Sequence, residues 1–199
     1  MSVTLWTTVF GTYHRFVDGW LAAAREAGAD RLLIVSDRPL DVDADVVVAQ
    51  PSGEYLYPSL LNVACENMDG WTWRMDVDDR ILPGVVRMLE GRDCDVLQVG
   101  LRGTRGAVSI PQVVPNEQML ALRCNPYRAG SAFTIDVWRR AGGFPDIAHC
   151  DWGFWRRCAR IGARFQASGE VAYIYREEPE DSLMGLYADP AYNEQAMAE

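Results

Sequence analysis

The chain has 199 residues, of which 49% are hydrophobic and 24% charged, a composition typical of a soluble globular protein with room for one α/β domain. Its 28 acidic and 19 basic side chains give a formal net charge of −9, which argues against non-specific binding to nucleic acid or anionic lipid. No run approaches the ~20 apolar residues of a membrane span and no secretory leader is apparent, so we expect no membrane span.

The first hundred residues alternate between apolar runs and segments with helical spacing. This pattern predicts strands at 3–10, 31–36, 44–50, 71–77 and 94–101 and helices at 13–28, 55–68 and 83–91. Gly28 is a natural end for the first helix, and Pro83 suits the first turn of the third. Strands separated by helices favour a mostly parallel sheet with helices on both faces.

The second half is less regular. Residues 102–127 are rich in Gly and Pro and are predicted to be a loop or hairpin excursion. Further elements are then expected as a strand and helix at 130–141, an amphipathic helix at 150–161 and a last strand at 171–176. We predict one domain at 1–178, followed at 179–199 by an acidic tail that is loosely packed or in part disordered.

The five cysteines are odd in number and include no CxxC pair, and the two histidines, His14 and His149, are far apart. A disulfide framework, a zinc knuckle and a His-rich metal site are therefore not expected. The expected location is a reducing compartment, the cytoplasm.

Three carboxylates, Asp76, Asp78 and Asp79, fall within four positions at the end of a predicted strand. Neither 41–46 nor 76–81 has the glycine at position six that an EF-hand loop needs. On spacing alone, a solvated turn and a metal–diphosphate site remain equally open. If the strand continues through this motif, Asp76 and Asp78 share a face, and one of them can hold Mg²⁺ or Mn²⁺. Ligands of such sheets bind at the carboxyl ends of the strands, where Asp37 is also expected.

Five motifs occur in a characteristic order. They are VTLWTTVFGTYHRF at 3–16, LLIVSD at 32–37, PSLLNVACENMDG at 58–70, MDVDDRILP at 75–83 and AGSAFTIDVWRRAGGFPDIAHCDWGFWRRCARIGARF at 129–165. Together they resemble the family 2 glycosyltransferases over about residues 3–176. The resemblance implies the GT-A fold, a nucleotide-diphosphate-sugar donor (a UDP-sugar is expected) and a divalent cation, Mn²⁺ or Mg²⁺.

The resemblance also implies a role for each matching residue. Asp37 would read the base, and Asp78 would hold the metal. Asp151 would be the general base of an inverting transfer. Independently of the resemblance, Trp152 is a candidate for stacking on an acceptor sugar, because aromatic faces suit the C–H-rich surfaces of sugars. The further donor-binding residues would be Thr8, Asn62, Asp76, Gly130 and Arg157.

The chain departs from the family pattern at three points. Cys150 stands where the family has a Glu before Asp151, Leu61 stands where it has an Arg before Asn62, and Arg38-Pro39 replaces Gly-Ser after Asp37. Asp151 could alternatively be the N-cap of its helix with Trp152 as core packing, and the two roles can coexist. His149 is interpreted as a packing residue in preference to a metal ligand.

Two other functions stay open. A nucleotidyltransferase also uses acidic metal ligands on a parallel sheet, but TTVFGTYHRF lacks the glycine-rich, basic loop that such enzymes use. A non-catalytic sugar-nucleotide-binding domain is kept open by Cys150. The acceptor is not identified: a protein, a glycan, a lipid-linked sugar or a modified base are all possible, with duplex DNA disfavoured by the acidic surface. Its site would be built from 102–127, 145–152 and the tail.

Overall fold

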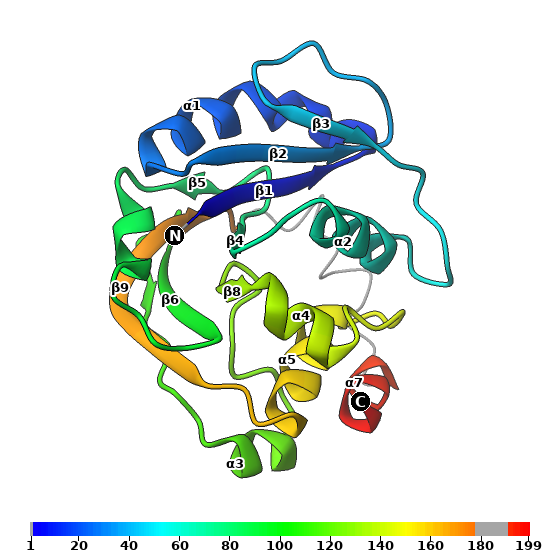
Figure 1. The fold of residues 1–199 in the computed structure, drawn as a ribbon, viewed down its shortest axis with the longest axis vertical. Coiled ribbons are helices and arrows are strands. Elements are labelled where there is room, and N and C mark those ends of the chain that lie inside the picture. The colour runs from blue at the N-terminus through cyan, green and yellow to red at the C-terminus, as the bar shows by residue number, and fades with distance from the viewer. Residues whose placement is uncertain (1, 178–190) are drawn as a thin grey trace.

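The sheet is built around strand β1 (Val3–Val9), all seven residues of which are buried. In the computed structural model, which describes residues 2–177 and 191–199, parallel neighbours flank this strand (Figure 1). They are β2 (Arg31–Ser36) on one side and β4 (Trp71–Arg74) on the other, with β3 (Asp45–Val48) outside β2. The carboxyl ends of these four strands therefore meet at one edge, as the alternating pattern predicts.

Beyond β4 the sheet becomes mixed. β8 (Ala132–Thr134) pairs antiparallel with both β4 and β6 (Val96–Gly103). β9 (Phe165–Tyr175) is parallel to β6, and the short strands β5 (Arg80–Ile81) and β7 (Val108–Ser109) pair antiparallel with β9 and β6. The α/β fold class is confirmed, but the sheet is less parallel than predicted, because β8 follows the 102–127 excursion and not a crossover helix.

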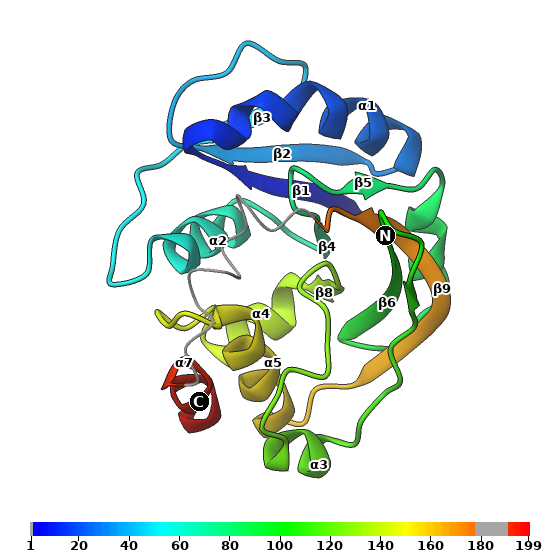
Figure 2. The same cartoon turned by 180° about the vertical axis from the view of Figure 1, so that it is seen from behind.

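Helices cover both faces of the sheet (Figures 1 and 2). One face packs against α1 (Val17–Ala27), which follows the 3-10 turn η1 (Gly11–Phe16), and against the 3-10 turn η2 (Val85–Leu89). The other face packs against α2 (Leu56–Glu66), α4 (Ile135–Ala141) and α5 (Cys150–Arg160). The core thus has two apolar layers, one on each side of the sheet. As predicted, α1 ends at Gly28, whose φ of 90° a glycine adopts without strain.

Several element bounds differ from the prediction. The strand predicted at 71–77 ends at Arg74, the helix predicted at 83–91 is a 3-10 turn, and the strand predicted at 171–176 begins at Phe165. The 102–127 excursion contains the short helix α3 (Asn116–Ala121) as well as β7. No helix in the described part of the chain is long and apolar enough to cross a membrane.

The end of the chain is not loosely packed where the structure describes it. Residues Ala191–Ala198 form α7, which lies beside α5 in both views (Figures 1 and 2). The Arg156 guanidinium donates to the Met197 carbonyl at 2.8 Å, and Arg157 pairs with Glu199 at 2.6 Å. The loose-tail prediction is therefore wrong for 191–199. The boundary at 178/179 stays a prediction, since residues 178–190 lie outside the described chain.

Candidate active site

The candidate site lies at the carboxyl edge shared by β1, β2 and β4. Thr8 is buried near the end of β1, Asp37 directly follows β2, and the aspartate motif follows β4. Because β1 pairs in parallel with both neighbours, these residues come to the same edge. The prediction that the acidic residues gather at strand ends is confirmed.

The aspartate motif is a turn, not a strand. β4 ends at Arg74, and the Asp79 backbone N–H donates to the Asp76 carbonyl at 3.1 Å. The expectation that strand alternation places Asp76 and Asp78 on one face therefore does not apply. Asp76 and Asp78 are partly exposed, whereas Asp79 is buried at 7% exposure. The turn thus presents two carboxylates outward and keeps the third inside.

A buried arginine supports this turn. Arg74 leaves the strand on the face opposite the core residues Trp73 and Met75, and its guanidinium donates to both the Asp76 carboxylate and the Tyr57 hydroxyl. The Tyr57 hydroxyl in turn donates to Asp76 Oδ1 at 3.0 Å, and Arg74 Cζ lies 4.9 Å from the Tyr57 ring centroid. Tyr57 also bonds to the Thr8 side chain. The sequence analysis did not single out Arg74, although a charged residue between Trp73 and Met75 was a visible signal.

The surroundings of the third carboxylate, Asp79, disfavour its charged form. Burial, then the charge of Asp76, raises the pKa of Asp79 to about 8. The same two causes, in the same order, raise the pKa of Asp78. Arg176 partly offsets the negative charge of the turn, since its backbone N–H donates to Asp79 Oδ1 at 3.0 Å and its Nη1 lies 3.3 Å from Asp78 Oδ2. The turn therefore concentrates negative charge that a bound cation would relieve.

The donor set fits one hard divalent cation. The described residues contain no group of three or more His, Cys, Asp or Glu side chains that could hold a metal by itself. Mg²⁺ and Mn²⁺ need no such group, because they bind through one or two carboxylates and take their remaining ligands from substrate phosphate and water. The partly exposed carboxylate of Asp78, beside Asp76, supplies that kind of ligand.

Asp37 is held by the turn that follows β1. Its Oδ2 accepts the Gly11 backbone N–H at 3.0 Å, and its Oδ1 accepts from His14 Nε2 at 2.7 Å. Burial acts to raise the pKa of Asp37, but these two bonds and the His14 charge outweigh it and hold the pKa below its ordinary value. Asp37 is therefore a permanent hydrogen-bond acceptor at neutral pH.

Asp151 lies in the first turn of α5, whose N-cap is His149. The alternative interpretation of Asp151 as the N-cap of this helix is therefore wrong. Asn125 Nδ2 donates to Asp151 Oδ2 at 2.9 Å. Burial raises the pKa of Asp151, and the positive charge of Arg74 opposes that rise. Asp151 is thus an oriented carboxylate with more basicity than one in water. Cys150, where the family has an acid, is buried, and burial also raises the pKa of its thiol.

Two of the predicted donor-binding residues, Asn62 and Arg157, use their polar groups in hydrogen bonds and ion pairs within the protein. The Asn62 amide donates to the Phe144 carbonyl at 2.9 Å and accepts from Phe144 N–H and Trp138 Nε1, which ties α2 to the segment after α4. Arg157 donates to the Gly142 carbonyl at 3.1 Å and pairs with Glu199. Among the described residues, no hydrogen bond or ion pair joins Asn62 or Arg157 to Asp37, Asp151 or the aspartate turn.

Gly130 and Trp152 are also packed. A Cβ on Gly130 would lie 3.0 Å from the Tyr173 ring, and its carbonyl accepts from Trp73 Nε1 at 2.9 Å, so the glycine allows a close approach of ring and backbone. Trp152 is 1% exposed, and its Nε1 has no hydrogen-bond partner in the described chain. In this conformation the Trp152 ring offers no open face to a sugar.

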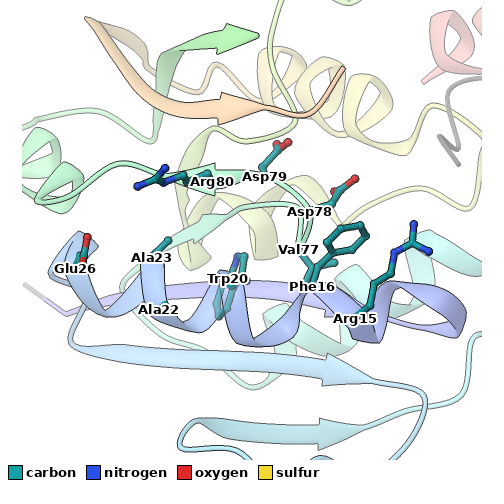
Figure 3. A pocket seen from close by; sticks show the side chains of 11 residues that line it. Arg15, Phe16, Trp20, Ala22, Ala23, Glu26, Val77, Asp78, Asp79 and Arg80 are labelled. Carbon is teal, nitrogen blue, oxygen red and sulfur yellow. The ribbon is translucent and has the colours of Figure 1, made fainter. Parts of the chain in front are cut away.

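A cavity of about 450 Å³ lies beside the aspartate turn (Figure 3). Its walls are α1 on one side and the turn leading into β5 on the other, and its polar groups include Asp78, Asp79, Arg15 and Arg80. Arg176 Cζ lies 4.8 Å from the centroid of the Phe16 ring, which also lines the cavity. The η1 turn therefore contacts Asp37 through His14, and through Phe16 it contacts Arg176, the partner of Asp78.

Four of the five cysteines are buried, and Cys124 alone is exposed. All five are unpaired. Cys124 directly precedes Asn125, the partner of Asp151.

No family model and no curated protein matches the sequence. Solved structures do resemble the fold. Staphylococcus aureus TarS 1–349 in complex with UDP-GlcNAc has a TM-score of 0.74 at 14% identity, over 98% of this chain and 64% of the TarS chain. Glucosyl-3-phosphoglycerate synthase from Mycobacterium tuberculosis, in complex with Mn²⁺, UDP and glucosyl-3-phosphoglycerate, has a TM-score of 0.60 at 14% identity. The match covers 98% of this chain and 79% of the synthase chain. The chain spans less than two thirds of the TarS fragment.

These likenesses establish the fold: a mixed α/β, GT-A-type architecture shared with TarS, which has been solved with UDP and with UDP-GlcNAc, and with the mycobacterial synthase.

Proposed function

We propose that the chain is a family 2-type glycosyltransferase, which moves a sugar from a nucleotide-diphosphate donor, expected to be a UDP-sugar, to an acceptor hydroxyl. The observation that carries this proposal is the meeting of the aspartate turn and the start of α5 around Arg74, at the same sheet edge where Asp37 follows β2. The Coulombic influence of Arg74 on Asp151 and its bond to Asp76 link the two acidic motifs of the resemblance. The shared fold and the order of the sequence motifs support it.

The donor would lie along the carboxyl edge of the sheet. Asp37 would accept a hydrogen bond from the base, and Asp76, fixed by Arg74 and Tyr57, would orient ribose or sugar hydroxyls. Asp78, beside Asp76, would hold Mn²⁺ or Mg²⁺. When bound, this cation neutralises the diphosphate and acts as a Lewis acid toward it as a leaving group. An acidic chain needs such a counter-charge.

Asp151 would act as the general base. It takes the proton of the acceptor hydroxyl as that oxygen forms a bond to the anomeric carbon and the bond from that carbon to the diphosphate breaks. One displacement of this kind inverts the anomeric centre. The Asn125 amide orients the carboxylate, and burial raises its pKa and hence its basicity. Since the carboxylate is the active form, activity should fall as pH falls through a pKa above the ordinary value of about 4.

The first test is calorimetric titration of UDP and GDP, with and without Mn²⁺, into wild type and Asp78→Ala. We expect Mn²⁺-dependent binding that Asp78→Ala abolishes. The matched control is Asp69→Ala, which removes an exposed carboxylate paired with Arg139 on the surface and should bind as wild type does. If neither nucleotide binds under any condition, the transferase proposal loses its support.

The second test is turnover of a panel of UDP-sugars with water as acceptor, in wild type and Asp151→Asn. We expect UDP release, inverted configuration in the released sugar by NMR, and loss of turnover in Asp151→Asn with nucleotide binding intact. A retained configuration would refute the role of Asp151. Pyrophosphate release would indicate a nucleotidyltransferase. Tight binding with no turnover in wild type would favour a non-catalytic domain, to which the buried Cys150 gives some support.

A further inference from the structure

Both hydrogen bonds to the Asp37 carboxylate come from a single 3-10 turn. Gly11 and His14 lie in η1, directly after β1, and each donates to a different oxygen of Asp37, at 3.0 and 2.7 Å. Gly11 has a φ of +56°, which a glycine adopts at little cost. The carboxylate is therefore fixed in orientation by a local element, although Asp37 itself is 26 residues away from Gly11 in the chain.

Among the described residues, the bond to Asp37 is the only hydrogen bond of the His14 side chain. Its side chain is only 9% exposed, while that of Asp37 is 28% exposed. Since the carboxylate accepts, Nε2 carries the hydrogen that it donates. The other ring nitrogen, Nδ1, is buried and has no hydrogen-bond partner in the described chain. Burying a polar atom without a partner is unfavourable, so the position of the ring is explained by what Nε2 does for Asp37.

We propose that His14 is a positioning residue that sets base selectivity by locking Asp37 as an acceptor aimed at the edge of the base. The inference rests on the proposed function, in which Asp37 contacts the base, and it adds the residue that makes that contact selective. Aromatic residues next to Gly11 and His14 in the chain pack with one another: the Phe10 centroid lies 6.1 Å from that of Tyr13 and 6.2 Å from that of Tyr57.

The selectivity follows from the hydrogen-bonding groups of the bases. Uracil presents an N–H between two carbonyl groups, and guanine presents neighbouring N–H groups, so both can donate to a fixed carboxylate. Cytosine presents a lone pair at the ring position where uracil has its N–H, and that lone pair repels the carboxylate. If the carboxylate is free to rotate, part of this discrimination is lost, because the carboxylate can turn away from the lone pair of cytosine.

The test compares wild type with His14→Leu, which removes the donor, and His14→Gln, which keeps an N–H donor on a side chain of similar reach. UDP, CDP and pyrophosphate are titrated into each protein by calorimetry in the presence of Mn²⁺. Circular dichroism and thermal melting identify any variant that is not folded, and if His14→Leu is unfolded, His14→Phe replaces it.

We expect His14→Leu to bind UDP about tenfold more weakly, as suits the loss of one charge-assisted bond, with a smaller ratio of UDP to CDP affinity. Pyrophosphate binding should not change, and His14→Gln should recover most of the UDP affinity. An unchanged UDP-to-CDP ratio in a folded His14→Leu overturns this inference alone. A wild-type protein that binds pyrophosphate but no nucleotide overturns the proposed function and this inference with it.

Discussion

At the scale of single residues, Arg74 is the side chain on which the site most depends. Burial opposes its charge, but the neighbouring Asp76 and Tyr57 outweigh burial and raise the pKa of Arg74, which therefore stays cationic inside the protein. Its guanidinium holds the turn that carries Asp76 against the N-terminal part of α2, where Tyr57 lies. Removing the guanidinium would leave a carboxylate and a hydroxyl without their buried donor.

We therefore expect Arg74→Met to lower the free energy of unfolding by about 2 kcal/mol, the usual penalty for buried polar groups left unpaired. Urea unfolding monitored by Trp fluorescence measures it. The control is Arg139→Met, which breaks an exposed pair with Asp69 and should cost less than about 0.5 kcal/mol. Equal losses in the two variants would contradict a structural role for Arg74.

The residue scale also shows how far the sequence could predict the site. Asp37, Asp76, Asp78 and Asp151 belong to motifs with recognisable spacing, and the structure places Asp37 and the aspartate turn at one edge, as expected. The contact of Arg74 with Tyr57 joins residues 17 positions apart on different elements, and no local pattern encodes it. For the same reason the amide of Asn62, which bonds to a residue 82 positions away, could not be separated from a ligand-binding amide.

At the scale of elements, the arginines of α5 join three helices. Arg156 is buried, and its guanidinium donates to the Leu120 carbonyl at the end of α3 at 2.9 Å and to the Met197 carbonyl at the end of α7 at 2.8 Å. Positive charge at the carboxyl ends of helices is favourable, because the last carbonyl groups of a helix have no partner within it.

Loss of this side chain should loosen both outer helices and leave the sheet intact. We expect Arg156→Met to increase amide hydrogen exchange in α3 and α7 several-fold, with exchange in β1 and β2 unchanged, as followed by mass spectrometry. Arg160→Met is the matched control, since its longer 3.4 Å bond to the Ala198 carbonyl is exposed. Faster exchange throughout the sheet would show that Arg156 supports the whole fold instead.

Element bounds also show why periodicity alone falls short. Strand character could be predicted for 71–77 because the run is rich in Trp and Met, but β4 stops at Arg74, where the chain turns to bring Asp76 and Asp79 together. β9 begins earlier than its apolar run because pairing with β6 continues through register shifts between Gln98 and Leu101, and these are set by the partner strand. Tertiary pairing overrides local pattern in both cases.

At the scale of the whole molecule, the acidic turn makes stability depend on pH. The pKa of Asp79 is about 8 in the folded state, raised by burial and then by Asp76, and about 3.8 when unfolded. Between these values the unfolded state has lost a proton that the folded state keeps. Stability contributed by Asp79 is therefore lost as pH rises from about 4 to about 8.

Asp79→Asn should remove this contribution. With EDTA present, we expect the melting temperature of the variant, relative to wild type, to increase between pH 5 and pH 8, as measured by scanning calorimetry. An Asp93→Asn control changes an exposed carboxylate, paired with Arg164, and should show no such trend. A difference between Asp79→Asn and wild type that is constant with pH would mean that Asp79 is ionised in the folded protein.

The distribution of thiols has a practical consequence. Because Cys124 is exposed and the other four cysteines are buried, a maleimide fluorophore should attach at one position without any engineering of the chain. That position adjoins Asn125, whose amide bonds to Asp151. Candidate acceptors can therefore be screened in solution by the change in emission of a reporter that sits next to the proposed base, before any of them has been turned over.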